Sequence, residues 1–250
     1  MDVYETVPAP TEDVFARLKA DLDVRAGGAV VSGGAALRRV GLPMLDAALQ
    51  GGLVSGAIAS FEGALSSGRM AILAHLLART SHHALVATID DGGLYPPDLQ
   101  RAGARLDRVA VVPATVPATI ARAADILLRS RAFSIVVMPG VQLKATVWSR
   151  LSALAHKADV LLVTLSQTAN NELAYFASTR LRCSLERVIW SNQSGIFCEL
   201  AGYEVTVQVL KHRRAAPGAV ANLRIVAARD GAPLRERAID TQQRSLRAVI

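Results

Sequence analysis

Two glycines with four residues between them have the spacing of a phosphate-binding loop. In a working loop of this kind, the lysine after the second glycine reaches the β- and γ-phosphates and the next hydroxyl holds magnesium. Here those positions are Arg69 and Met70, and a thioether is too soft a ligand to replace a hard oxygen on magnesium. The sequence therefore keeps the form of the loop without its two chemical groups. The residues of this degenerate loop are Gly63, Ser66, Ser67, Gly68, Arg69 and Met70.

The arginine in this loop has two expected uses. A guanidinium is broad and planar where a lysine ammonium is compact, so we expect Arg69 either to fill the empty phosphate pocket or to pair with Asp90 or Asp91. Backbone N–H groups at a helix N-terminus still attract an anion, which leaves nucleotide binding as the alternative. We favour a structural turn, and we expect no cofactor and no metal.

The chain around the loop alternates short Val/Ile/Leu runs with helical patterns. This alternation predicts a parallel sheet covered on both faces. Beyond residue 179, strand-like runs follow one another without long helices, which predicts an antiparallel extension of the same sheet. We expect parallel strands at 57–61, 84–89, 108–112, 134–138 and 160–165, helices at 69–79, 97–104, 117–131 and 146–157, and later strands at 181–185, 187–190, 195–200, 203–210 and 222–227.

Three regions are expected along the chain. Residues 1–35 form an N-terminal arm with a short amphipathic helix, residues 36–230 form the core, and residues 231–250 form a basic tail. The arm helix packs either on its own domain or on a partner, and we leave both alternatives open. The candidate partner contacts in the arm and the tail are Phe15, Leu18, Leu22, Arg235, Arg237, Arg244 and Arg247.

Composition limits the class of protein. At 250 residues, 51% hydrophobic and 20% charged, the chain is a globular domain with a substantial core. Its two cysteines lack the spacing of a zinc or redox motif. We expect neither a membrane span nor a signal peptide, and hence a cytoplasmic protein. The net charge of +7 favours nucleic acid or an acidic protein surface as a partner, and the alternative is a surface that only keeps the protein soluble.

In their order and spacing, these segments together resemble the RecA-type recombinase family from residue 41 to about residue 226. The resemblance implies an α/β fold with a RecA-like core, in which a mostly parallel central sheet is flanked by helices and ends in an antiparallel C-terminal extension. The segments that carry it are the approach to the first core strand at 45–56, the loop at 63–70, a strand ending in an acidic pair at 88–91, a strand ending in glutamine at 165–167, the next strand at 175–181 and a basic turn at 209–217.

Several positions depart from the family's pattern. The position of the general-base glutamate, two residues after Asp90, is Gly92, and the position of the magnesium-organising aspartate is Met138. Asp91 is adjacent, but side chains alternate along an extended segment, so we expect it to point elsewhere. Because phosphoryl transfer depends on positioned charge, loss of the whole set predicts a pseudo-ATPase with no catalytic residue.

Other parts of the family's machinery are retained or shortened. Gln167 matches the glutamine that senses the γ-phosphate, and Lys211 and Arg213 match the basic turn that reaches nucleotide across a filament interface. The two loops that hold DNA in the family are clipped here, at 141–146 and 167–175. We therefore expect DNA contact to be weak or indirect.

With its degenerate loop, compact size and basic end, the chain most closely resembles the ImuA family of bacterial damage-induced (SOS) mutagenesis. The resemblance implies a non-catalytic adaptor in translesion synthesis, cytoplasmic and associated with the nucleoid. Its implied partners are an inactive, clamp-binding Y-family-like protein (ImuB), RecA itself and, indirectly, a C-family error-prone polymerase. Two alternatives stay open: a recombinase paralogue that binds single-stranded DNA or modulates recombinase filaments, and an atypical NTPase.

Overall fold

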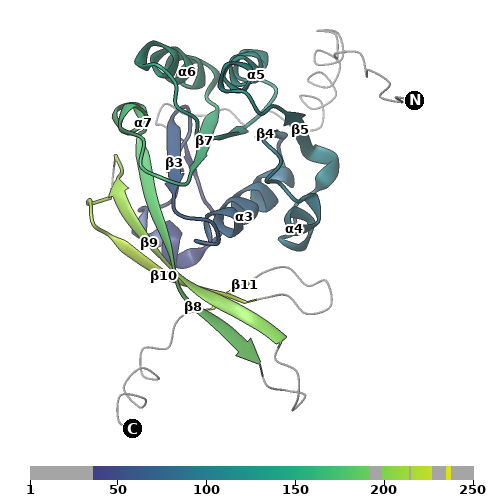
Figure 1. The fold of residues 1–250 in the computed structure, drawn as a ribbon, viewed down its shortest axis with the longest axis vertical. Helices are drawn as coiled ribbons and strands as arrows, with labels where there is room; N and C mark the ends of the chain where they lie inside the picture. The colour runs from purple at the N-terminus through teal and green to yellow at the C-terminus, as the bar shows by residue number, and fades with distance from the viewer. Residues whose placement is uncertain (1–35, 192–198, 214, 227–234, 238–250) are drawn as a thin grey trace. The chain divides into compact units, whose positions relative to one another are not determined.

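The computed structural model describes residues 36–191, 199–213, 215–226 and 235–237 (Figure 1). Contacts divide the chain into two units, Met1–Gly34 and Ala35–Ile250, and every element below belongs to the second. No helix in these described ranges is long and apolar enough to cross a membrane.

A nine-stranded sheet has the strand order β11-β10-β9-β8-β3-β7-β6-β4-β5. Five neighbouring strands of this sheet, β3, β7, β6, β4 and β5, pair in parallel, as expected for short aliphatic strands linked by helices. Each starts and ends within two residues of its predicted position, which confirms the mostly parallel sheet. Their bounds are β3 Ile58–Glu62, β4 Val86–Asp90, β5 Val109–Pro113, β6 Ile135–Pro139 and β7 Leu161–Ser166.

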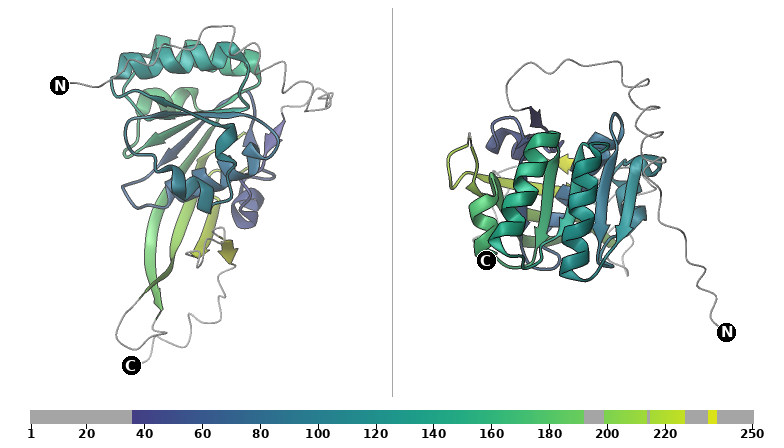
Figure 2. Two further views of the ribbon diagram at one scale, coloured as in Figure 1. Left: turned by 90° about the vertical axis from the view of Figure 1, so that its right-hand side faces the viewer. Right: turned by 90° about the horizontal axis from the view of Figure 1, so that it is seen from above.

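Helices follow the parallel strands and cover both faces of the sheet (Figures 1 and 2). Helices α5 and α6 pack side by side on one face, and α3 and α4 lie on the other. Proline at the first turn of α4 and of α5 suits a helix start, because its missing N–H would have no partner there. The bounds are α3 Arg69–Ser81, α4 Pro96–Arg101, α5 Pro117–Ser130 and α6 Ala145–Ala158, with a 3₁₀ turn, η1, at Leu106–Arg108.

The C-terminal extension is antiparallel, as predicted, but its strands are longer than predicted. Strand β8 (Thr179–Ser191) pairs with β9 (Glu199–Lys211) along its length, whereas it pairs with β3 only through its first residues. Register shifts interrupt the β8–β9 ladder at three places. We predicted two short strands where β8 lies, because a bulge breaks the period-2 side-chain pattern without ending the pairing. Near β9 we predicted strands at 195–200 and 203–210, and residues 195–198 of the first lie outside the described residues. Strand β10 (Val220–Val226) continues the sheet.

Besides η1 and a short helix after β7, four short elements were not predicted. Strands β1 (Leu37–Arg38) and β2 (Leu53–Val54) pair as a small antiparallel sheet. Helix α2 (Pro43–Ala48) lies between these two strands in the sequence. Strand β11 (Arg235–Arg237), inside the predicted basic tail, pairs with β10 at the edge of the large sheet. Elements of two to six residues carry too few side chains for a pattern to show in the sequence.

The segment 175–181 was predicted wrongly as a strand throughout. Helix α7 runs from Asn171 to Phe176, and β8 begins only at Thr179. The helix starts because the side chain of Asn170 accepts a hydrogen bond from the N–H of Leu173, at 3.1 Å.

The core is aliphatic, in keeping with the 4% aromatic content. All five residues of β3 are buried, and the largest fully buried side chains are Trp148 and Phe61. Burial of β3 on both faces places the loop that follows it at the centre of the sheet's carboxyl edge. This is where open α/β sheets form their sites.

Candidate functional site

The degenerate loop joins β3 to α3 and packs closely against the antiparallel strands. A Cβ on Gly63 would lie 2.5 Å from the carbonyl oxygen of Cys183, and a Cβ on Gly68 would lie 2.5 Å from Cγ2 of Val205. Gly68 also has a φ of +86°, a conformation that side chains disfavour. Both glycines of the motif are therefore required by packing and backbone geometry, with no phosphate needed to explain them.

Arg69 fills the loop rather than pairing with an acid. Its Nη1 donates a hydrogen bond to the carbonyl oxygen of Gly63 and another, at 2.7 Å, to that of Ser166 at the end of β7. Burial lowers the pKa of Arg69, and the charges of Cys183 and Asp91 act in the opposite direction. Arg69 makes no salt bridge with Asp90 or Asp91 in the described ranges, and its guanidinium instead connects the start of the loop to the neighbouring strand.

The other loop residues lie in three different environments. Ser66 is exposed and has a φ of 63°. The hydroxyl of Ser67 is buried, and the described residues provide it with no hydrogen-bond partner. The side chain of Met70 is 37% exposed. An apolar thioether thus stands at the surface where the family's magnesium-binding hydroxyl would be.

Both aspartates of the acidic pair face one pocket, so the expectation that Asp91 points elsewhere was wrong. Strand β4 ends at Asp90, and the chain then turns through Gly92, whose φ is +103°. Alternation of side chains holds only along an extended strand, and it stops at this turn. Oδ1 of Asp90 accepts a hydrogen bond from the N–H of Leu94, at 2.9 Å, which closes the turn.

The end of β6 presents apolar side chains to the same pocket. Val137 and Pro139 line it, whereas Met138 is fully buried and does not. Because side chains alternate along a strand, Met138 points to the opposite face of the sheet. The position assigned to the lost magnesium aspartate is therefore not the one that faces the pocket here.

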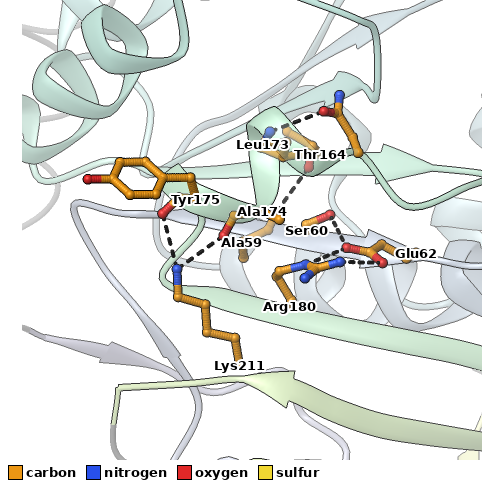
Figure 3. A network of polar contacts seen from close by, with 10 residues as sticks. Ala59, Ser60, Glu62, Thr164, Leu173, Ala174, Tyr175, Arg180 and Lys211 are labelled. Atoms are coloured by element: carbon orange, nitrogen blue, oxygen red, sulfur yellow. Dashed lines mark hydrogen bonds and ion pairs between the residues drawn. The ribbon is translucent and has the colours of Figure 1, made fainter. Parts of the chain in front are cut away.

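Gln167 joins this group, whereas the basic turn does not. The exposed Gln167 follows β7 and lines the pocket with Arg69 and the acidic pair. Nζ of Lys211 instead donates hydrogen bonds to the carbonyl oxygens of Ala174 and Tyr175, both at 3.1 Å, at the end of α7 (Figure 3). Arg213 is exposed beyond β9.

The pocket itself has a volume of about 500 Å³ at the carboxyl edge of the parallel sheet. Polar groups occupy a minority of its wall: Arg69, Thr88, Asp90, Asp91, Gln167 and Thr168. The remainder is apolar or glycine: Leu65, Met70, Leu73, Ile89, Gly93, Leu94, Val137, Pro139, Gly140, Val141 and Leu165.

Sequence reasoning missed a buried ion pair beside the loop. Nε and Nη2 of Arg180 donate to the two carboxylate oxygens of Glu62, at 2.7 and 3.0 Å (Figure 3). The carboxylate also accepts from the hydroxyl of Ser60, at 3.4 Å. The signal was a charged residue ending an otherwise apolar strand, directly before Gly63. This bidentate pair joins β3 to β8 where the two strands run parallel.

The candidate partner contacts of the two ends are not placed by the structure. Phe15, Leu18, Leu22, Arg244 and Arg247 lie outside the described residues. Arg235 and Arg237 are described only through the backbone of β11.

A family model described as the MT3502 N-terminal domain matches residues 46–170, half of the chain. The chain belongs to the MT3502 N-terminal domain family. The region matched by this family contains the degenerate loop, the acidic pair and Gln167, so these features lie within the family's domain. A search among curated proteins found no match.

The crystal structure of the RadB recombinase resembles this chain with a TM-score of 0.64 at 17% sequence identity. The likeness covers 81% of this chain and 100% of that one. At such identity it shows the fold alone. The MT3502-type chain therefore has the fold of a RecA-type recombinase.

Proposed function

We propose that this chain is a RecA-type adaptor that does not hydrolyse ATP and works by docking to other proteins. The observation that carries the proposal is the position of Arg69. Its Nη1 donates hydrogen bonds to the backbone carbonyl groups of Gly63, in the loop, and Ser166, at the end of β7. In the family, the lysine at this position binds phosphate. A group held in this way is part of the loop's own structure.

The rest of the pocket supports the absence of turnover. The position of the general base is Gly92, which has no side chain, and β6 faces the pocket with Val137 and Pro139. One oxygen of Asp90 is engaged in closing a turn. Catalysis of phosphoryl transfer rests almost entirely on positioning and charge stabilisation, and here the groups for both are replaced.

An exposed apolar strip on the β8–β9 hairpin supports a docking role. Val188, Trp190 and Leu200 are 38%, 60% and 47% exposed, and Trp190 lies directly opposite Leu200 in the ladder. We call these three residues the hairpin strip. Exposed apolar clusters mark protein interaction sites, and tryptophan is enriched among the residues that dominate binding energy.

The proposal extends to the process and partners that the ImuA resemblance implies. The adaptor would act in damage-induced mutagenesis, supporting error-prone translesion synthesis. Its direct partner is an ImuB-type, Y-family-like protein that binds the sliding clamp, with RecA as a second partner and a C-family polymerase reached indirectly. The RecA-type fold and the altered loop support this choice over an active recombinase.

A pull-down of the full chain from DNA-damaged cells, followed by mass spectrometry, tests the proposal. We expect enrichment of an inactive Y-family-like protein and a C-family polymerase over undamaged cells. Enrichment of neither protein, or recovery dependent on nucleic acid and abolished by nuclease, would contradict it. The second result would favour a DNA-binding recombinase paralogue.

A further inference from the structure

The pocket beside the degenerate loop has a charge balance that does not suit a nucleotide. Its lining contains one guanidinium, that of Arg69, and two carboxylates, those of Asp90 and Asp91. Nη1 of the guanidinium already donates to two carbonyl oxygens. A triphosphate placed here would add negative charge beside two carboxylates, and Met70 stands where the family's hydroxyl holds the magnesium that balances such charge.

The acidic group that faces outward is Asp91. Its side chain is exposed and interacts electrostatically with Arg69, but the described part of the chain gives it no hydrogen bond and no salt bridge. This carboxylate stands out on a chain whose net charge is +7. It therefore favours a cationic group as its partner from outside the chain.

The mouth and wall of the pocket are apolar next to this carboxylate. Leu65 is 72% exposed in the loop and Met70 is 37% exposed at the start of α3. Both contribute to the pocket wall together with the more enclosed Leu73 and Leu94. Covering a wall of this kind with an apolar side chain is favourable, because it removes apolar surface from water. A volume of about 500 Å³ accommodates one or two large side chains.

We infer that this pocket docks a segment of a protein partner, which inserts a large apolar side chain between Leu65 and Met70 and places a lysine or arginine beside Asp91. The inference rests on the proposed function: it identifies where the adaptor would dock and which chemical groups its partner would present there. The site occupies the sheet edge that nucleotide uses in working members of the fold. Two features of this chain, apolar mouth residues and an exposed carboxylate that makes no salt bridge within the described residues, make it a peptide site.

A random peptide library displayed on phage, selected on the immobilised full chain, tests this without knowing the partner. We expect enriched peptides that combine a large apolar residue with a nearby Lys or Arg. The labelled peptide should bind the full chain in fluorescence anisotropy, and millimolar Mg–ATP should not displace it. Exchange of its basic residue for Glu should weaken binding to the unaltered chain.

Variants of the pocket mouth locate the binding site. Leu65→Asp, Met70→Glu and Asp91→Lys should each weaken peptide binding at least about tenfold. The Glu-substituted peptide should regain affinity for the Asp91→Lys chain. Matched controls are Ile126→Asp, at a 53% exposed position on α5, and Asp107→Lys, at an exposed aspartate near β5, because neither residue lines the pocket. Both controls should bind as the unaltered chain does, and circular dichroism should show that all variants are folded.

Several results would overturn the inference. They are the absence of enriched peptides, selection of acidic peptides, binding unchanged in the three pocket variants, or displacement by Mg–ATP. None of these outcomes bears on whether the pull-down recovers the mutagenesis proteins. The docking site and the proposed function can therefore fail separately.

Discussion

At the residue scale, Arg69 gives the loop a structural contact that a lysine is less suited to make. Lysine would place a compact charge over the loop, whereas the guanidinium reaches two carbonyl oxygens, one directly after β3 and the other at the end of β7. The same side chain that removes a phosphate ligand thus adds a structural connection between the loop and β7. Its contribution should be measurable as stability.

Arg69→Ala should lower the free energy of unfolding by about 1–3 kcal/mol, because the carbonyl group of Gly63 loses its donor and that of Ser166 keeps only the N–H of Gly63. Urea unfolding followed by circular dichroism measures this change. Arg101→Ala is the control, since Arg101 pairs with Asp98 at the surface and both side chains are 61% exposed. That substitution should change stability by less than about 1 kcal/mol. Equal losses of stability from the two substitutions would show that the loop contacts of Arg69 stabilise the fold no more than a surface ion pair does.

Cys183 gives a second prediction at the residue scale. Burial raises the pKa of its thiol from 9.0 to about 12. In a Cys198→Ser chain at pH 8, iodoacetamide should modify folded Cys183 at least about a hundredfold more slowly than the urea-unfolded chain, because the thiolate is the nucleophile. Mass spectrometry over time measures the rate. Equal rates in both states would contradict the burial of this thiol.

The same shift has a consequence for stability at high pH. The unfolded thiol ionises around pH 9, whereas the folded thiol stays neutral until about pH 12. Its contribution to the free energy of unfolding is therefore present below pH 9 and is lost as the pH rises toward 12.

Among the elements, α7 (Asn171–Phe176) lies in the connection after β7, where the sequence predicts a shortened DNA-holding loop. Asn170 controls this short helix: its Oδ1 accepts from the N–H of Leu173, and its Nδ2 donates to the carbonyl oxygen of Val141, at 3.3 Å. Lys211 caps the other end of the helix. The connections after β6 and β7 are thus tied to each other and to β9.

Asn170→Ala should cost about 1 kcal/mol of stability through loss of the helix cap, with an added loss from the bond to Val141. Asn171→Ala is the matched control, because its side chain is exposed one residue further along the same helix. Thermal unfolding of both variants measures the difference. A loss for the control as large as that for Asn170→Ala would contradict the assignment of the cap.

The hairpin strip is an element-scale feature whose predicted role is in binding rather than folding. Trp190→Ser should leave the free energy of unfolding unchanged within about 0.5 kcal/mol, because the ring is 60% exposed. It should weaken capture of the protein partner in the pull-down. Val116→Ser, at a 56% exposed position before α5, is the control and should leave capture unchanged. Undiminished capture by Trp190→Ser would remove the strip from the docking surface.

At the scale of the whole molecule, the positions compared with the family's catalytic groups follow separate strands that the sheet brings to one edge. The loop follows β3, the acidic pair ends β4, and β6 supplies Val137 and Pro139. Restoring one element therefore leaves the others without their function.

Arg69→Lys combined with Met70→Thr restores the loop motif and should still give no phosphate release above background with Mg²⁺ and ATP. The reason is that the base position is Gly92 on a different strand end. A malachite-green assay of the purified full chain measures release, and the unaltered chain is the reference. Turnover by either chain that Arg69→Ala abolishes would instead identify an atypical NTPase.

By itself, the sequence determined the parallel strands and their helices, because hydrophobic periodicity is a local property of each segment. It also determined which catalytic residue types are missing from the loop. It could not determine the bonding of Arg69 or the Glu62–Arg180 pair, whose partners are 97 and 118 residues apart in the chain. Nor could it show that Asp91 turns toward the pocket, since strand alternation ends where the chain bends at Gly92. Only the tertiary structure decided these points, because contacts between distant segments depend on strand order and register.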